Sequence, residues 1–180
     1  MIGQERLKQE FANFTLSTLP KTMLFMGQEG CGKHLFIKEL ADKFNLMIRE
    51  IEVTPDLDDK LNEYQANPVN TVYIINMSKI SQANQNRFLK FIEEPGKNAW
   101  IAIFVETLSL AIDTVVNRCQ KYSFDNYTKD ELKKITNTDY EDFIYDICKT
   151  PGELMKVNLD NLKACQELCS TMVKKLNKAS

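Results

Sequence analysis

Residues 22–44 read TMLFMGQEGCGKHLFIKELADKF, and this stretch decides the fold. Its first five residues form an apolar run typical of a buried strand, and its last twelve have the spacing of a helix. The residues that join them, 27–33, match the pattern G-x-x-x-x-G-K. Glycines in such a loop let consecutive backbone N–H groups point at phosphate oxygens, and the following helix adds the positive end of its dipole. The stretch therefore predicts a phosphate-binding loop between a strand and a helix.

The loop defines a set of candidate phosphate-binding residues, namely Gly27, Gly30, Cys31, Gly32, Lys33 and His34. Lys33 would place a point charge on the terminal phosphates of a nucleotide. The next position is normally Ser or Thr, whose hydroxyl coordinates Mg²⁺, but in this chain it is His34. Because imidazole is a poor partner for a hard cation that prefers oxygen ligands, we expect His34 to fill this position without binding a metal.

Strand-like and helix-like segments alternate along the first 125 residues, as in a parallel sheet covered on both faces. With Thr22–Met26, the expected strands are Met47–Val53, Thr71–Ile75, Trp100–Val105 and Gln120–Phe124. The expected helices are Ile2–Leu19, Lys33–Phe44, Leu57–Ala66 and Ser81–Glu93. Ser81 can cap the last of these helices, and Glu94-Pro95-Gly96 stops it.

The character of the chain changes after Asn126, where helical segments follow without a strand candidate. These segments are Thr128–Thr136, Tyr140–Lys149 and Gly152 to about Asn177. The sequence therefore predicts an α/β fold in two parts. Residues 1–125 form an αβα domain with a five-stranded parallel sheet, and residues 126–180 form a small all-helical domain.

Composition excludes several classes of protein. The chain has 23 Lys and Arg against 25 Asp and Glu, for a net charge of −2, and 43% of its residues are hydrophobic. These values are typical of a globular protein and not of a disordered one. The apolar run Ala99–Val105 is too short to span a bilayer, and the N-terminus lacks the pattern of a secretory signal. We therefore expect a cytoplasmic protein that touches DNA only locally or through a complex.

The cysteines indicate reduced thiols and no metal site. They are Cys31, Cys119, Cys148, Cys165 and Cys169, with no C-x-x-C pair, and His34 is the only histidine. A zinc finger or ribbon cannot be assembled from these residues at normal spacing. Cys165 and Cys169 lie four residues apart on an expected helix, so we expect both to face the core.

The third expected strand lacks the acidic residues of an ATP-hydrolysing site. A phosphate-loop NTPase normally ends this strand with Asp, often followed by Glu, to hold the metal and position water. In this chain Asn76 takes the position of the Asp and Met77 that of the Glu. Asn brings no negative charge, and Met can neither bind Mg²⁺ nor act as a base. Glu93 and Glu94 lie too far along the following helix to substitute, so we expect no ATP hydrolysis at this site.

Several further segments resemble one family. They are IGQE at residues 2–5, LFMG at 24–27, QNRFLKFIEEP at 85–95, TVVNRCQ at 114–120 and TPGE at 150–153. Together they resemble the AAA+ superfamily and, within it, the delta-prime family of clamp-loader subunits of bacterial DNA polymerase III. The segment at 85–95 follows that family's pattern Q-N-x-x-L-K-x-[LI]-E-E-P, while those at 114–120 and 150–153 are similar to its patterns T-I-x-S-R-C-Q and S-P-G-R. The resemblance covers about residues 1–157.

The resemblance implies a role for Arg118, which matches the arginine of the S-R-C motif. In the family this residue is an arginine finger that enters the ATP site of a neighbouring subunit, where its planar fork stabilises phosphate charge. The implied partners are clamp-loader ATPase subunits of the gamma/tau type and the delta subunit. Primer–template DNA would be met through the assembled complex and the sliding clamp indirectly, with no membrane involved.

Three features depart from the family. No cysteine beyond Cys31 lies between the loop and the third strand, so the family's four-cysteine zinc module is missing from this stretch. Glu153 stands where a sensor arginine is usual, which weakens any nucleotide-coupled movement of the lid. The chain also lacks the family's third, collar-forming domain, so we expect either a truncated form or an abbreviated relative.

The sequence therefore predicts a non-hydrolysing clamp-loader subunit that helps place a sliding clamp on primed DNA and supplies Arg118 to a neighbouring ATPase subunit. Two alternatives stay open. One is a working AAA+ ATPase that tolerates Asn76 and His34, and the other is a structural module that binds nucleotide. No cofactor is required by the sequence, and ATP or ADP held without hydrolysis is compatible with it.

Overall fold

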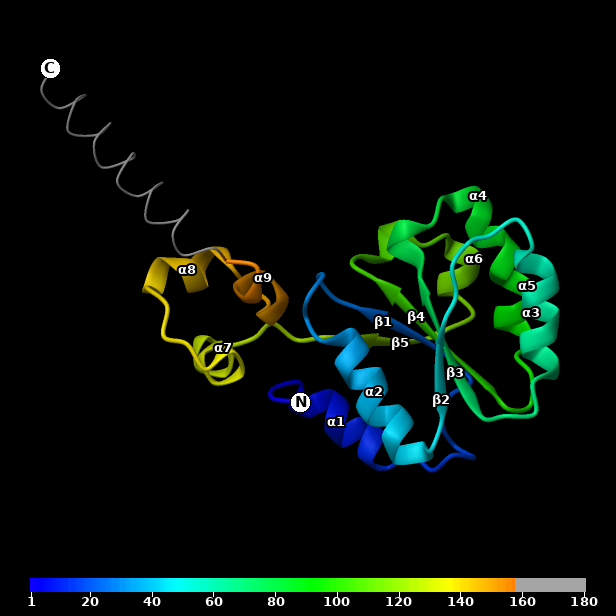
Figure 1. Cartoon of the computed structure of the whole chain (residues 1–180), viewed down its shortest axis with the longest axis horizontal. Coiled ribbons are helices and arrows are strands. Elements are labelled where there is room, and N and C mark those ends of the chain that lie inside the picture. Colours follow the sequence, from blue (N-terminus) through cyan, green and yellow to red (C-terminus); the bar gives the residue numbers. More distant parts are fainter. Residues whose placement is uncertain (158–180) are drawn as a thin grey trace, which may run out of the picture.

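The structure, a computed structural model, describes residues 1–157, which contain a five-stranded sheet flanked by helices (Figure 1). The strands are β1 (Thr22–Met26), β2 (Met47–Glu50), β3 (Thr71–Asn76), β4 (Ala99–Val105) and β5 (Gln120–Ser123). All pairs are parallel, in the order β2-β3-β4-β1-β5. The predicted α/β fold is therefore confirmed. Because the strand order reverses at β1, the loop after β1 opens at the crevice where such sheets bind ligands.

Side chains of β1 alternate between two hydrophobic cores, one on each face of the sheet. Phe25 lies in the core under α1 (Glu5–Ala12) and α2 (Lys33–Phe44). Leu24 lies in the core under α3 (Leu57–Ala66) and the shorter helices that follow β3. Figure 1 shows these two groups of helices on opposite sides of the sheet. The three layers hold the strand ends, and hence the loops, in fixed positions.

The first helix is shorter than predicted. Helix α1 ends at Ala12, whereas a helix as far as Leu19 was expected. Thr15 and Thr18 form a turn instead, in which the Thr18 hydroxyl accepts a hydrogen bond from the Thr15 amide (2.9 Å). Threonine hydroxyls that bind nearby backbone groups compete with helix formation. At the other end, Gln4 has a left-handed backbone (φ 60°), so the helix cannot begin at Ile2.

The expected helix Ser81–Glu93 is formed by α4 (Gln82–Gln85), a 3₁₀ turn (Asn86–Phe88) and α5 (Leu89–Glu93), which follow one another directly. Ser81 occupies the N-cap position but makes no capping hydrogen bond with its side chain. Gln85, Phe88 and Phe91 are all buried, at a spacing of three residues. Side chains three apart eclipse in a 3₁₀ turn, so this conformation places all three on the buried side. The chain is therefore helical without a gap from Gln82 to Glu93, close to the predicted bounds, with one turn tightened to 3₁₀.

The other elements lie close to their predicted bounds. Helices α2 and α3 match the prediction, while β2 ends at Glu50 instead of Val53 and β5 ends at Ser123. The short helix α6 (Asp113–Val116) was not predicted, because four residues are too few to show a period. Within residues 1–157, no helix has the length and apolar character needed to cross a bilayer.

Three short helices follow the sheet, α7 (Lys129–Thr136), α8 (Asp142–Ile147) and α9 (Pro151–Met155). They surround a small core formed by Leu132, Ile144, Tyr145 and Leu154. Helix α9 ends at Met155, whereas the third expected helix continued to about Asn177. The part of that expected helix beyond Val157, with Cys165 and Cys169, lies outside the described residues. The division of the chain into domains at residues 125/126 stays a prediction.

Gln85 is a fully buried polar residue that joins three segments. Its side-chain nitrogen donates to the carbonyls of Ile80 (3.0 Å) and Leu110 (2.8 Å), and its side-chain oxygen accepts from the Ile112 amide (2.9 Å). The side chain thereby ties the loop after β3 to the loop after β4. Buried backbone groups that lose such partners destabilise a protein strongly.

We expect Gln85→Leu to lower the free energy of unfolding by roughly 2–4 kcal/mol, because the apolar side chain leaves the three backbone groups unpaired. Urea denaturation of the purified chain measures this change. Gln82→Leu on the same helix is the control, since Gln82 is exposed and its substitution should cost less than about 0.5 kcal/mol. Equal midpoints for the two variants would contradict the structural role of Gln85.

Candidate functional site

The phosphate loop lies between the end of β1 and the start of α2, as predicted. Gly30 and Gly32 have left-handed backbones, with φ of 79° and 98°, and Gly32 is the N-cap of α2. A Cβ on Gly27 would lie 2.7 Å from the sulfur of Cys31, so this position is crowded as well. The glycines therefore give the loop a backbone that residues with side chains rarely adopt. Its N–H groups lie at the positive end of α2, where an anion is favoured.

Lys33 turns back onto its own loop. Its ammonium donates hydrogen bonds to the carbonyls of Gly27 and Gln28, the latter at 2.9 Å, and lies 3.6 Å from the sulfur of Cys31. Burial raises the pKa of the Cys31 thiol, which therefore stays neutral at physiological pH. The ammonium of Lys33, which was expected to bind the phosphates of a nucleotide, thus binds backbone carbonyls of its own loop.

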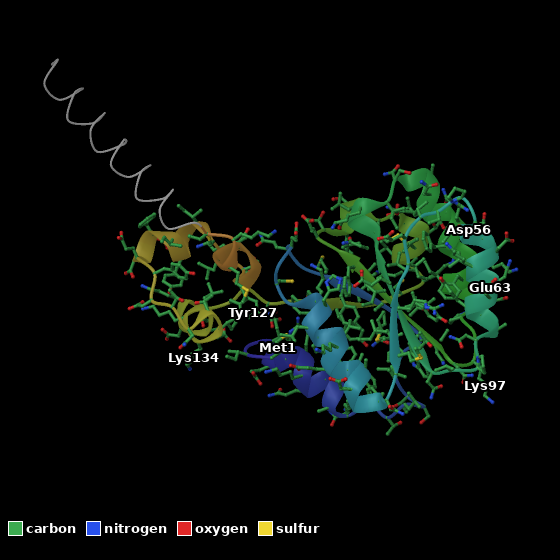
Figure 2. The ribbon with its side chains drawn as sticks, viewed as in Figure 1. Met1, Asp56, Glu63, Lys97, Tyr127 and Lys134 are labelled. Carbon is green, nitrogen blue, oxygen red and sulfur yellow. The ribbon has the colours of Figure 1, made fainter. Side chains whose placement is uncertain are left out.

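The segment that contains α7, α8 and α9 forms hydrogen bonds with the phosphate loop. Three consecutive loop carbonyls accept hydrogen bonds from it: Glu29 from the Thr150 hydroxyl (3.0 Å), Gly30 from the Gly152 amide (3.2 Å) and Cys31 from the Tyr127 hydroxyl (2.8 Å). Figure 2 shows Tyr127 at the junction between the sheet and these helices. The loop contributes only carbonyl groups to this contact, so the N–H groups of the loop take no part in it.

Two glycines meet at the centre of this contact. A Cβ added to Gly152 would lie 2.5 Å from the Cα of Gly30, a distance that side chains do not tolerate. Beside them, Lys156 lies 3.2 Å from the Glu29 carboxylate, and its hydrogen bond and charge hold the pKa of that carboxyl below its ordinary value. The close approach of the loop and α9 therefore depends on glycine at both positions.

Glu153, which the resemblance puts at the position of a sensor arginine, is part of the α9 cap. Its carboxylate accepts hydrogen bonds from the amides of Lys149 (2.8 Å) and Thr150 (3.0 Å), and the Thr150 hydroxyl accepts one from the Glu153 amide (3.2 Å). This capping box fixes the turn that holds Thr150 against the loop. The acidic residue thus serves the contact between the loop and α9.

His34 and Asn76 line one cavity of about 400 Å³ beside the ends of β2 and β3. The Nε2 atom of His34 lies 3.4 Å from the Glu50 carboxylate. Met77, in contrast, is fully buried in the core under α3. The structure therefore brings together two of the three residues that depart from an ATPase site. Within residues 1–157, no three His, Cys, Asp or Glu side chains are placed to hold a metal ion.

A second cavity, of about 390 Å³, lies on the other side of the loop. Its apolar wall is formed by Met1, Ile2, Leu35, Tyr127, Ile135 and Met155, and the loop contributes Gly30 and Gly32. Figure 2 places Met1 and Tyr127 in this part of the molecule. A concave, mostly apolar cavity of this size suits a small ring system.

Arg118 lies at the other end of the sheet from the loop. Gln120 at the start of β5 pairs with Met23 near the start of β1, and Arg118 lines a groove of about 670 Å³ with Lys21. The phosphate loop follows the opposite end of β1, about 16 Å away along a five-residue strand. This separation exceeds the reach of an arginine side chain.

Glu93 forms an ion pair with Arg118, a contact that the sequence analysis missed. Glu93 was expected only to lie too far along its helix to substitute for a metal-binding acid. The two residues lie in separate motifs 25 positions apart, so no local pattern links them. Tyr127 and Thr150 were missed for the same reason, because their contacts with the loop are long-range.

Comparisons with known proteins agree with this fold. Residues 45–128 match a family model described as DNA polymerase III, delta subunit. Similar solved structures include the RuvB Holliday junction branch migration motor of Thermotoga maritima (16% identity, TM-score 0.59), covering 76% of this chain and 51% of that one. A DNA polymerase III gamma subunit-related protein of the same organism is also similar (16% identity, TM-score 0.54), covering 79% of this chain and 51% of that one.

These solved structures are likenesses of fold, and the chain spans about half of their length. No curated protein matches it by sequence.

We expect Gly152→Ala to separate α9 from the phosphate loop, because the added methyl group would overlap the Gly30 backbone. Overpacking of about 1–3 kcal/mol corresponds to roughly 5- to 150-fold faster amide exchange for residues 150–156 if they exchange by local opening. Hydrogen–deuterium exchange of the purified chain measures this rate. Met155→Ala, an exposed change on the same helix, is the control. Unchanged protection in the Gly152 variant would show that the contact is not tight.

Proposed function

We propose that this clamp-loader-like AAA+ protein is a non-hydrolysing subunit of a bacterial DNA polymerase III clamp loader, in which it supplies Arg118 to a neighbouring subunit. The matched family model, described as DNA polymerase III, delta subunit, supports the assignment to this complex. The motifs at residues 85–95 and 114–120 support it independently. The chain would accelerate ATP hydrolysis by a neighbouring subunit without hydrolysing ATP itself.

The position of Arg118 is the observation that carries the proposal. Its groove and its own phosphate loop lie at opposite ends of β1, so the guanidinium cannot reach a phosphate held by its own loop. A phosphate that meets Arg118 must therefore come from another molecule. Arginines supplied in trans in this way stabilise the charge that develops during phosphoryl transfer.

Three side chains support the absence of intrinsic hydrolysis. Lys33 is bound by carbonyls of its own loop, and His34 lies beside Glu50 in place of a metal-binding hydroxyl. Met77, in the position of the catalytic acid, is buried in the core. Neither His34 nor Met77 supplies an oxygen ligand for Mg²⁺, and the buried thioether of Met77 cannot activate water.

The proposed partners follow from the function. ATPase subunits of the gamma/tau type would provide the nucleotide that Arg118 contacts, and the delta subunit would complete the complex. Primed DNA and the sliding clamp would be met through the assembled complex. The near-neutral net charge of −2 is consistent with such indirect contact with DNA.

We expect Arg118→Ala to slow ATP turnover by a reconstituted complex in which only the ATP site served by this chain remains active. Trans-acting arginines contribute roughly 10³- to 10⁵-fold, so the loss at this one site should be about 10³-fold or more. Arg118→Lys should not restore the rate, because an ammonium lacks the planar fork. DNA-stimulated phosphate release measures both variants.

Arg49→Ala is the control for this experiment, because Arg49 is exposed and lies on β2 at the opposite edge of the sheet. It should leave the turnover rate unchanged. If both Arg118 variants assemble normally and turn over ATP at the wild-type rate, the trans-acting role is wrong.

A second candidate function is nucleotide binding without hydrolysis. It is favoured by the apolar cavity beside Gly30 and Gly32, and by the loop N–H groups that the contact with α9 leaves unused. A nucleoside base in this cavity would place its phosphates near those N–H groups. Nucleotide would then act as a structural ligand of the chain.

Both functions predict that the purified chain releases no phosphate from Mg-ATP. Linear release that is abolished by Lys33→Ala would contradict them and favour an active ATPase. The second candidate also predicts that ADP at about 100 times its dissociation constant raises the free energy of unfolding by roughly 2.7 kcal/mol. Thermal unfolding with and without ADP measures this change, and an unchanged midpoint excludes the second candidate.

A further inference from the structure

The guanidinium of Arg118 is held on two sides. Its Nε–H donates to the Glu93 carboxylate, and its Nη1 donates to the Thr114 carbonyl at 2.7 Å. Nη2 has no hydrogen-bond acceptor among residues 1–157. Because the guanidinium is planar, these two contacts fix its plane and leave the Nη2 side for an acceptor from outside.

The two groups that hold Arg118 are themselves rigidly placed. Glu93 ends α5, whose Phe91 and Ile92 are buried, and Thr114 lies on α6 beside the buried Val115. Helices α5 and α6 pack against each other. The arginine is therefore held by two elements of the folded core rather than by mobile surface groups.

The turn after Glu93 is also fixed to α3. The Gln65 side chain donates to the Glu94 carbonyl (2.6 Å), and a Cβ on Gly96 would lie 2.0 Å from the Gln65 carbonyl oxygen. This turn therefore packs directly on the α3 backbone at a position that only glycine fits. The end of α5 that carries Glu93 is thereby joined to α3.

The groove around Arg118 suits an anion. Its charged lining residues are Lys21, Glu93 and Arg118, so the cations outnumber the single carboxylate. The Lys21 ammonium lies over the Trp100 ring at 3.5 Å and donates to the Lys97 carbonyl, and partial burial lowers its pKa. The carboxylate of Glu93 is bound by Arg118, which limits its repulsion of an incoming phosphate.

An exposed ion pair contributes little to folding stability, so stability does not explain this arrangement. A long side chain that must meet a phosphate loses rotamer freedom when it does so, and a residue that holds it beforehand removes that cost. We propose that Glu93 is a positioning residue that holds Arg118 in the orientation in which it meets the phosphate of a partner's nucleotide. This inference rests on the proposed function of Arg118.

The test uses the complex with one active ATP site. We expect Glu93→Ala to lower kcat by roughly three- to tenfold, the cost of immobilising one long side chain, with KM for ATP and assembly unchanged. Glu93→Gln should retain most of the rate, because its amide oxygen can still accept from Nε. Glu94→Ala is the matched control, since it removes an equal charge from the next exposed position and should turn over at the wild-type rate.

A double-mutant cycle separates positioning from a general structural effect. In the Arg118→Ala background, Glu93→Ala should cause no further loss, because there is no guanidinium left to orient. An additive loss, a lowered affinity for the partner subunits, or a faster rate in Glu93→Ala would overturn the proposal.

Two further outcomes distinguish this inference from the function on which it rests. If Arg118→Ala is slow while Glu93→Ala turns over at the wild-type rate, only the positioning role of Glu93 is wrong. If Arg118→Ala itself turns over at the wild-type rate, the trans-acting function fails and the positioning role fails with it. Urea denaturation of each variant establishes that a slow rate does not arise from unfolding.

Discussion

Strand β1 lies between β4 and β5, and the parallel pairing of these strands constrains everything else in the molecule. The phosphate loop must leave the carboxyl end of β1, and the chain that enters β5 must pass beside its amino end. Arg118 and Lys33 are consequently held at opposite ends of one rigid strand. No change of side-chain rotamer can bring them together, so the loop and the arginine cannot serve the same nucleotide.

The arginine end of the sheet is built as a connected unit. Gln65 on α3 holds the turn after Glu93, Glu93 holds Arg118, and the Thr114 carbonyl on α6 holds the same guanidinium. Each contact joins segments that are far apart in the sequence. The exposed Arg6 is also held by a carboxylate, that of Asp125, and by the carbonyl of Ser123. Arg118 differs in its place, because it lines a groove with Lys21 at the end of the sheet opposite the phosphate loop. At that place, a guanidinium held in one orientation can meet a ligand from outside the chain.

Local patterns in the sequence were sufficient to predict most of the fold. The strands of the buried sheet, α2 and α3 carry their own apolar periodicity, and the glycines of the loop require a backbone that few other residues adopt. The 3₁₀ turn at Asn86 and the end of α1 at Ala12 depend on tertiary burial and on threonine side chains, which periodicity does not show. The site was predictable as residues of the loop, whereas the contacts of Thr150 with Glu29 and of Glu93 with Arg118 are long-range. The functional roles of these residues stay predictions.

The loop has a structural role that does not depend on a bound nucleotide. Gly30 must lack a side chain to admit Gly152, and its carbonyl is the acceptor for the Gly152 amide. Gly27 must likewise leave room for the sulfur of Cys31. A chain that no longer hydrolyses ATP would still need these glycines to keep α9 in place. The glycines of the pattern G-x-x-x-x-G-K in this protein are therefore evidence for the shape of the loop. The chemistry that this shape supports depends on the side chains of Lys33, His34 and Met77.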